Sequence, residues 1–191
     1  FSLEYLTLVK KVYFPEVIIM KPNLTLIGMP GAGKSTVGII LAKLLSFNFV
    51  DTDILIQLSQ QKSLQRIIDE SDHLNLRRIE EREILNMKVA RHVIATGGSA
   101  VYSEPAMAHL REISEITFLR VDYQEILKRI RNFKTRGIAR SKEQSFLDLY
   151  NERQVLYEKY AGTTIDCTGL DQEEIAGIIA RDYIQRHCQA S

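Results

Sequence analysis

The chain has 191 residues, enough for one domain with a good-sized core but too few for two large domains. Its 45% hydrophobic and 26% charged residues are typical of a soluble globular protein, and a net charge of +1 with no long basic run argues against nucleic acid as the main partner. The absence of any run of about 18 apolar residues argues against a membrane-spanning segment. The cysteines Cys167 and Cys188 match no metal or redox spacing, which favours a reducing, cytoplasmic setting.

Residues 1–21 form an N-terminal extension of uncertain role. The extension lacks the ordered basic, apolar and small-residue zones of a signal peptide. Met20, directly before the first predicted strand, is a natural start. Residues 1–19 therefore come from an upstream start or an added segment, or they form an extra element that packs on the core or on a neighbouring subunit. A single main domain is expected over residues 22–187.

Residues 24–36 predict a strand, a glycine-rich loop and a helix in direct succession. A short apolar run ends at Gly28, the pattern G-x-x-x-x-G-K-S follows, and residues 35–45 have apolar positions at helical spacing. Glycines let backbone N–H groups point at phosphate oxygens, and the helix N-terminus adds partial positive charge. The flanking strand and helix favour this P-loop interpretation over an ordinary glycine-rich turn. The residues expected to bind a nucleotide are Gly31, Ala32, Gly33, Lys34, Ser35 and Thr36, with Lys34 on the β- and γ-phosphates and Ser35 on Mg²⁺.

Strands alternate with helices after the P-loop, which predicts right-handed crossovers and a parallel sheet with helices on both faces. Ligands of such sheets lie at the carboxyl ends of the strands. The P-loop, residues 51–53 and residues 96–99 should therefore face one cleft. Further strands are expected at 47–50, 93–95, 116–119 and 163–167, and helices at 53–60, 63–70, 74–89, 105–112, 123–132, 146–160 and 171–187.

Two aspartates at the end of the second predicted strand are candidates for the chemistry. Asp53 can accept or orient the proton of an attacking hydroxyl group. Asp51 could hold water on Mg²⁺. The alternative is that Asp51 or Thr52 only caps the following helix.

Arg77 and Glu80 share one face of the predicted helix 74–89, because they are three residues apart. One interpretation is that the helix is exposed and that salt bridges between these side chains stabilise it. The other is that Arg77 grips an anionic group of the acceptor while Glu80 holds Arg77 in place. The backbone N–H groups of residues 96–98 are expected to face the same acceptor, unless this segment is a plain turn.

The polar stretch 132–145 predicts a mobile loop. A lid carrying Arg136 would exclude water and place positive charge near the γ-phosphate. A solvated surface loop is the alternative. Arg153 is a second candidate for an anion contact, or else a charge on a helix surface. The four histidines form no ligand spacing and receive no role.

The order of these motifs resembles the shikimate kinase family over residues 22–186. The motifs are the P-loop, Asp-Thr-Asp, Leu-Arg-Arg-Ile-Glu-Glu, Thr-Gly-Gly, an arginine-bearing loop and Glu-Arg-x-x-x-Leu-Tyr. The resemblance implies an α/β three-layer P-loop kinase fold, similar to nucleoside monophosphate kinases, with a five-stranded parallel sheet. It also implies a lid at 132–145 and a small helical acceptor-binding region at 52–80.

The resemblance further implies roles for particular residues. Lys34, Asp53 and Arg136 would be catalytic, and the cofactors would be ATP and Mg²⁺, the metal bound by Ser35 and through water by Asp51. The reaction would convert shikimate to shikimate 3-phosphate in a monomer or weak homodimer. The acceptor site would consist of Asp53, Arg77, Gly97, Gly98 and Arg153, with Arg129 near the adenine and Arg136 in the lid.

Three segments near the acceptor site depart from the family pattern. Ser99 replaces the third glycine of Gly-Gly-Gly, residues 72–76 replace Gly-Glu-x-x-Phe, and residues 137–139 replace the Pro-Leu-Leu of the lid. A related kinase acting on another small hydroxy acid or amino-acid alcohol therefore stays open as an alternative. A non-catalytic nucleotide-binding relative is a further alternative.

Overall fold

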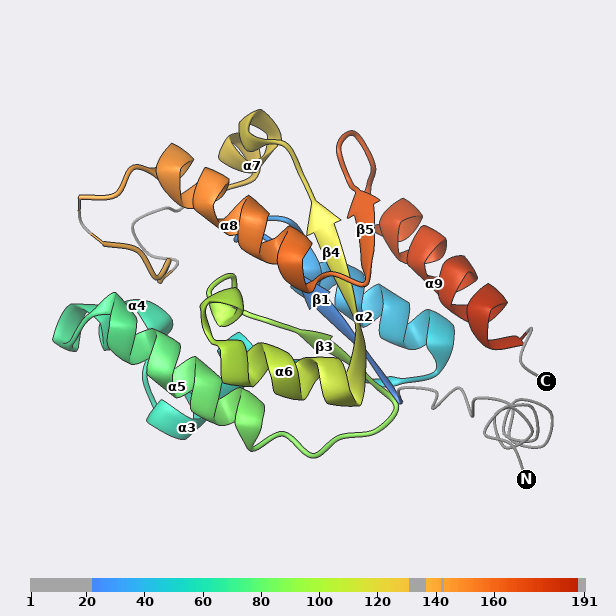
Figure 1. The fold of residues 1–191 in the computed structure, drawn as a ribbon, viewed down its shortest axis with the longest axis horizontal. Coiled ribbons are helices and arrows are strands. Elements are labelled where there is room, and N and C mark those ends of the chain that lie inside the picture. The colour runs from blue at the N-terminus through green and yellow to red at the C-terminus, as the bar shows by residue number, and fades with distance from the viewer. Residues whose placement is uncertain (1–21, 131–136, 142, 189–191) are drawn as a thin grey trace, which may run out of the picture.

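A computed structural model describes residues 22–130, 137–141 and 143–188 (Figure 1). The described strands form one parallel sheet in the order β2-β3-β1-β4-β5. This sheet confirms the predicted α/β fold class. The N-terminal extension, and with it the predictions made for residues 1–19, lies outside the described residues. The strands are β1 (Asn23–Ile27), β2 (Asn48–Asp51), β3 (His92–Ala95), β4 (Ser114–Arg120) and β5 (Thr163–Asp166).

The helices cover both faces of the sheet. Helices α2 and α9 pack against each other on one face, and α6 and α8 lie over the other (Figure 1). Helices α3, α4 and α5 pack together beside the sheet. The helical elements are α2 (Lys34–Leu45), α3 (Thr52–Gln60), α4 (Leu64–Glu70), α5 (His73–Leu85), the short 3₁₀ helix η1 (Ala100–Tyr102), α6 (Glu104–Ile113), α7 (Tyr123–Arg129), α8 (Phe146–Tyr160) and α9 (Gln172–Cys188).

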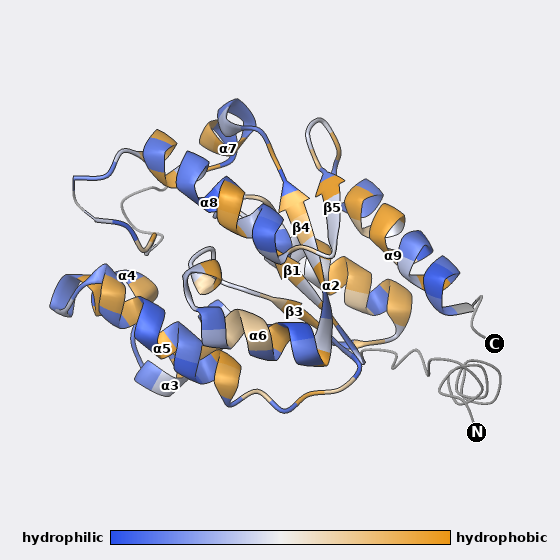
Figure 2. Cartoon of the chain, viewed as in Figure 1, coloured by the Kyte–Doolittle hydropathy of each residue, from blue (hydrophilic) through white to orange (hydrophobic). Residues whose placement is uncertain are grey.

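Strand β1 lies in the middle of the sheet, and all five of its residues are buried. A central parallel strand is covered on both faces, so a nearly continuous apolar run suits it. Its two polar side chains are satisfied: Asn23 donates to the Val89 and Ile113 carbonyls, both at 2.9 Å, and Thr25 shares a 2.6 Å hydrogen bond with Ser114. Figure 2 shows the hydrophobic residues along β4 and α2, where the core lies.

Most predicted elements occur where the sequence placed them, and the differences have local causes. The helix expected over 74–89 ends at Leu85. Met87 is buried in the core beyond that end, and the Val89 carbonyl accepts its hydrogen bond from Asn23 instead of from a further helical turn. Helix η1 was not predicted.

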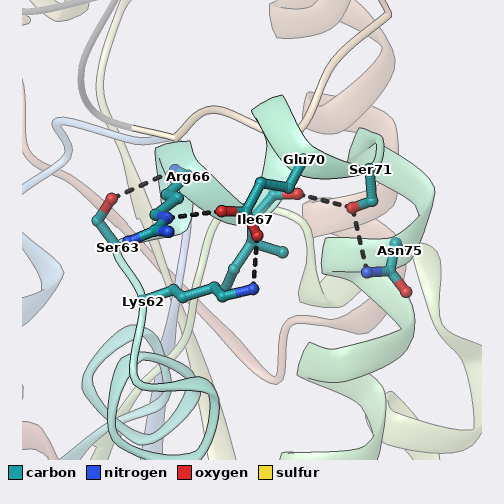
Figure 3. Close-up of polar contacts among 7 residues, drawn as sticks. All are labelled: Lys62, Ser63, Arg66, Ile67, Glu70, Ser71 and Asn75. Atoms are coloured by element: carbon teal, nitrogen blue, oxygen red, sulfur yellow. Dashed lines mark hydrogen bonds and ion pairs between the residues drawn. The ribbon is translucent and has the colours of Figure 1, made fainter.

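The acceptor-binding region expected at 52–80 forms a packed unit of helices with its own small core. Helix α4 is fixed on its outer side by a surface network (Figure 3). Glu70 accepts from Lys62 at 2.5 Å and from Arg66 at 2.6 Å, and the Ser71 hydroxyl bridges the Ile67 carbonyl and Asn75. The small core consists of Ile56, Ile67, Leu76, Ile79 and Ala139.

No helix in the described part of the chain is long and apolar enough to cross a lipid bilayer.

Candidate active site

A pocket opens at the carboxyl edge of the sheet. Its wall is formed by the P-loop, the first turn of α2, residues of α3, α4 and α5, the turn at residues 96–99, the segment 137–139 and one residue of α8. We call the segment 137–139 the strap. The pocket is the cleft expected from parallel-sheet geometry, because the P-loop, Asp53 and residues 96–99 all line it.

The P-loop adopts the tight backbone that its glycines permit. Gly31 and Gly33 have φ angles of +87° and +94°, in the left-handed region that other residues avoid. A Cβ at Gly31 would lie 2.7 Å from Ile130 Cγ1. Lys34 begins α2, so the N–H groups of the first turn point out of the helix toward the pocket without intrahelical acceptors.

Ala32 differs from the other P-loop residues that are predicted to bind the nucleotide. Its N–H donates to the Met29 carbonyl at 3.0 Å, its side chain is buried, and it is absent from the pocket wall. The tight turn of the loop uses this N–H internally. The described pocket wall therefore contains Gly31, Gly33, Lys34, Ser35 and Thr36 but not Ala32.

Lys34 is buried beneath the P-loop, and its ammonium group is bonded to backbone carbonyls of the same loop. Its ammonium group donates to the carbonyls of Gly28 at 2.7 Å and Met29 at 3.0 Å. Phosphate oxygens are stronger acceptors for an ammonium group than these carbonyls, since the hydrogen bond is then assisted by both charges. A nucleotide in the pocket can thus compete for this side chain.

Asp51 links the P-loop helix to α3. Its Oδ2 accepts from the Ser35 hydroxyl at 2.6 Å, and its Oδ1 accepts from the Asp53 N–H at 2.9 Å. Asp51 therefore caps α3 and also faces Ser35, while its predicted contact with a water on Mg²⁺ stays a prediction. A serine hydroxyl beside a carboxylate is a donor set that suits Mg²⁺, which keeps several of its waters.

Asp53 lines the pocket next to Gly97. A Cβ at Gly97 would clash with Glu80 Oε1 and lie 2.7 Å from Asp53 Oδ1, so a larger residue there would need both carboxylates to move. The N–H of Gly97 donates to the Thr52 hydroxyl at 2.8 Å. The Thr96 N–H donates to the Leu26 carbonyl at 3.2 Å. The expectation that the N–H groups of residues 96–98 face the acceptor is therefore wrong for Thr96 and Gly97, because both groups are bonded within the protein.

Gly98 is a point of close packing between three elements. A Cβ there would lie 2.7 Å from Pro30 Cδ and 3.0 Å from Arg153 Nη1. The Tyr157 hydroxyl donates to the Gly98 carbonyl at 2.7 Å. Arg153 and Tyr157 lie four residues apart on one face of α8, so both reach the same turn.

The two predicted acceptor arginines meet at one carbonyl of the strap. Arg153 is 1% exposed and donates to the Ala139 carbonyl at 2.7 Å, while Arg77 approaches the same oxygen at 3.4 Å. Arg153 lines the pocket. Arg77 is not among the residues of the pocket wall, because its guanidinium lies over the Tyr102 ring, 3.6 Å from the centroid; its contact with the acceptor stays a prediction.

Glu80 does not hold Arg77 in the described structure. It is buried, and its Oε2 accepts from the Ser99 hydroxyl at 2.5 Å. Desolvation and the nearby Asp53 charge raise the pKa of Glu80 to about 7, against the opposing influence of Ser99, Arg153 and Lys34. Glu80 Oε1 has no hydrogen-bond partner among the described residues.

The strap belongs to the predicted lid, of which residues 137–141 and 143–145 are described. Gly137 has φ +63° and donates to Gln65 Oε1 at 3.2 Å, and a Cβ there would lie 2.5 Å from Leu64 Cβ. The strap is therefore docked on α4. Arg136, the predicted lid arginine, lies outside the described residues.

Arg129 lies at the end of α7 and near the P-loop. Its Nε donates to Glu125 at 3.0 Å, and its Cβ would be 3.9 Å from a Cβ at Gly31. It does not line the pocket. A position beside the P-loop is compatible with the predicted contact near the adenine, which stays a prediction.

Sequence reasoning missed four contributions to this site. These are the Thr52 hydroxyl on Gly97, the Tyr157 hydroxyl on Gly98, the Ser99–Glu80 hydrogen bond and the Ala139 carbonyl. The spacing of Tyr157 from Arg153 is a signal that the sequence contains. The other three depend on packing between distant segments.

Comparison with known proteins agrees with this geometry. A family model described as shikimate kinase matches residues 30–183. The shikimate kinase of Thermodesulfovibrio yellowstonii is 35% identical over 164 residues, which cover 84% of this chain and 94% of the relative. The shikimate kinase of Caldanaerobacter subterraneus is 32% identical over 166 residues, which cover 85% and 96%.

Solved structures show the same fold. The structure of the shikimate kinase from Acinetobacter baumannii in complex with shikimate matches with a TM-score of 0.80 and 28% identity, over 86% of this chain and 94% of that one. A thymidylate kinase from Candida albicans shares the fold at a TM-score of 0.56 and 12% identity. On the extent of these matches, the chain belongs to the shikimate kinase family of small-molecule kinases.

Proposed function

We propose that the chain transfers the γ-phosphoryl group of ATP to the 3-hydroxyl of shikimate, giving shikimate 3-phosphate and ADP. The observation that carries the proposal is that one pocket contains a P-loop, the carboxylate of Asp53 and the buried guanidinium of Arg153. These groups match the three parts of the reaction: a polyphosphate donor, a hydroxyl nucleophile and an anionic acceptor. The Acinetobacter baumannii relative, solved with shikimate, supports the choice of acceptor.

The nucleotide end would act mainly by placing charge. The N–H groups at the start of α2 and the Lys34 ammonium would bind the β- and γ-phosphates. Ser35, and Asp51 through water, would hold Mg²⁺. The metal, when bound, neutralises charge on the phosphate oxygens.

The acceptor end would orient the nucleophile. Asp53 would accept or align the proton of the reacting hydroxyl group. Arg153 would bind the acceptor carboxylate together with Arg77. Both arginines now face the Ala139 carbonyl, and a carboxylate is the stronger acceptor for guanidinium groups, so acceptor binding would replace these two bonds.

A kinase of another small hydroxy acid is the second candidate, because several of the positions that depart from the family pattern line the pocket. Leu76, Ser99 and the strap all belong to its wall. Substitutions at the wall change which acceptor fits, while the nucleotide end is unaffected. This candidate would use the same arginines for a different anion.

The test is ADP release from ATP and Mg²⁺, measured with and without shikimate at a fixed enzyme concentration. We expect a clear shikimate-dependent rate that disappears with shikimate methyl ester, because the ester removes the charge that the arginines bind. ADP release that ignores shikimate but responds to another hydroxy acid would overturn shikimate as the acceptor. Binding of ATP without transfer to any acceptor would overturn the kinase assignment. The cytoplasmic location and the monomeric or weakly dimeric state stay predictions.

A further inference from the structure

One buried hydrogen bond at the pocket wall has no role in the reaction described above. Ser99 and Glu80 are 7% and 2% exposed, and the Ser99 hydroxyl donates to Glu80 Oε2 at 2.5 Å. Both residues line the pocket. The bond joins the turn after β3 to helix α5, across 19 residues of sequence.

The other oxygen of Glu80, Oε1, lies at the pocket wall beside Asp53. A Cβ at Gly97 would meet both Glu80 Oε1 and Asp53 Oδ1, so these two oxygens flank the same point of the wall. Glu80 Oε1 is buried and has no hydrogen-bond partner in the described part of the chain. A buried carboxylate oxygen without a donor is costly to keep, and it is satisfied only when a donor enters the pocket.

We propose that Ser99 is a positioning residue, whose hydroxyl fixes one oxygen of Glu80 so that the other faces the acceptor beside Asp53. The glutamate side chain has three rotatable bonds, and a single strong hydrogen bond to one oxygen restricts them. Without the Ser99 hydroxyl, neither oxygen of Glu80 keeps a described side-chain donor. The assignment deepens the proposed function and rests on it for its effect on the acceptor.

The Ser99 hydroxyl also affects the charge of Glu80. The groups with the largest influence on this carboxyl are Ser99 from the turn, Asp53 from α3, Arg153 from α8 and Lys34 from α2, and Arg77 and Tyr157 also interact with it. A hydroxyl that donates to the ionised form favours that form. Removing it leaves desolvation and the Asp53 charge less opposed, so the pKa of Glu80 is expected to rise in the variant.

The first test compares Ser99→Ala with Ser103→Ala in steady-state kinetics. Ser103 is the matched control, because its hydroxyl donates to the next glutamate of α5, Glu81, at 2.6 Å and caps α6 outside the pocket. For Ser99→Ala we expect the KM for shikimate to rise on the order of tenfold and the KM for ATP to stay constant, since a hydrogen bond to a charged group is lost. The acid limb of kcat/KM should also move to higher pH. Equal effects in both variants, or equal changes in both KM values, would overturn the proposal.

The second test needs no acceptor, so it separates this proposal from the proposed function. The full chain carries ¹³C at glutamate carboxyl groups, and the Glu80 signal is identified by its loss in Glu80→Gln. We expect the titration midpoint of Glu80 to rise in Ser99→Ala and in Ser99→Gly. In Ser103→Ala and in Ser99→Thr, which keep a hydroxyl group at position 99, the midpoint should equal that of the wild type. A midpoint unmoved in folded Ser99→Ala and Ser99→Gly contradicts the proposal. A shifted midpoint in a chain that ignores shikimate would leave Ser99 as the positioning residue and remove only the acceptor assignment.

Discussion

The two ends of the pocket, the proposed nucleotide end and the proposed acceptor end, are built in different ways. At the nucleotide end, Lys34 bonds to carbonyls five and six residues away, and the helix that follows the loop supplies N–H groups from its own first turn. At the acceptor end, Arg77 meets Ala139 across 62 residues, and Gly97 meets Thr52 across 45. The nucleotide end is therefore formed largely by local sequence, and the acceptor end by the packing of distant segments.

This difference has a functional consequence. Side chains at the acceptor end can be substituted without changing the P-loop, because the P-loop conformation depends on its own local backbone. The departures from the family pattern that line the pocket occur at the acceptor end, at Leu76, Ser99 and the strap. Substitutions at that end should change acceptor kinetics and leave ATP binding in place, which the following variants test.

The largest effect is expected from Asp53→Asn. The amide keeps the shape of the side chain but cannot accept a proton, so kcat should fall by about 10²–10⁴-fold, the usual contribution of a general base. The dissociation constant for ATP should stay close to the wild-type value. Rapid-quench measurement of phosphoryl transfer and equilibrium titration with ATP give the two numbers. Turnover at the wild-type rate would remove Asp53 from the mechanism.

A smaller effect is expected from Arg77→Ala, and it should fall on the acceptor alone. A charge-assisted hydrogen bond of this kind contributes roughly 1.5–3 kcal/mol, so the KM for shikimate should rise about tenfold or more. Arg78→Ala is the control, since Arg78 is the adjacent, exposed arginine of α5. Equal increases in the KM values for ATP and shikimate would show that Arg77 acts only through the fold.

Gly97→Ala tests the close approach of two carboxylates. The added methyl group meets Glu80 and Asp53, so both side chains must move, and overpacking of this kind costs about 1–3 kcal/mol. We expect a lower melting temperature together with a higher KM for shikimate. Gly162→Ala is the matched control, because a Cβ there would lie 3.5 Å from the Ile116 carbonyl, an ordinary contact. Similar behaviour of both variants would contradict the close packing at Gly97.

The same contrast explains what the sequence could predict. Alternating apolar segments predicted the parallel sheet and nearly every helix, because strand and helix periods are local properties. The end of α5 escaped prediction because Val89 is held by Asn23, which is 66 residues away. A local hydrophobic period cannot predict a contact between residues so far apart in the sequence.

At the site, the sequence identified the right segments but not every partner. Helical spacing placed Glu80 and Arg77 on one face, and this was correct as geometry. It could not show that Glu80 bonds to Ser99 or that Arg77 reaches the Ala139 carbonyl, since both depend on how α5 packs. The P-loop needed no such information, apart from the internal hydrogen bond of Ala32.

The last prediction concerns stability. It measures how much the buried charge of Glu80 lowers the free energy of unfolding. Burial and the Asp53 charge raise the pKa of Glu80 from 4.5 to about 7. Between these values the folded state binds a proton that the unfolded state has lost, so the free energy of unfolding falls as the pH rises through this range. The carboxylate of Glu80 therefore destabilises the fold above pH 7.

Glu80→Gln should relieve this cost, because the amide stays neutral and can still accept from Ser99. We expect its free energy of unfolding to exceed that of the wild type by about 1–3 kcal/mol at pH 8, with the difference shrinking toward pH 5. Denaturant unfolding at several pH values measures it, and Glu81→Gln is the control, since Glu81 bonds to Ser103 on the same helix. A Glu80→Gln difference that does not vary with pH would show that Glu80 carries no burial cost. A difference that follows the expected sign, together with weaker acceptor binding, would show that the acceptor end retains a destabilising charge because the reaction needs it.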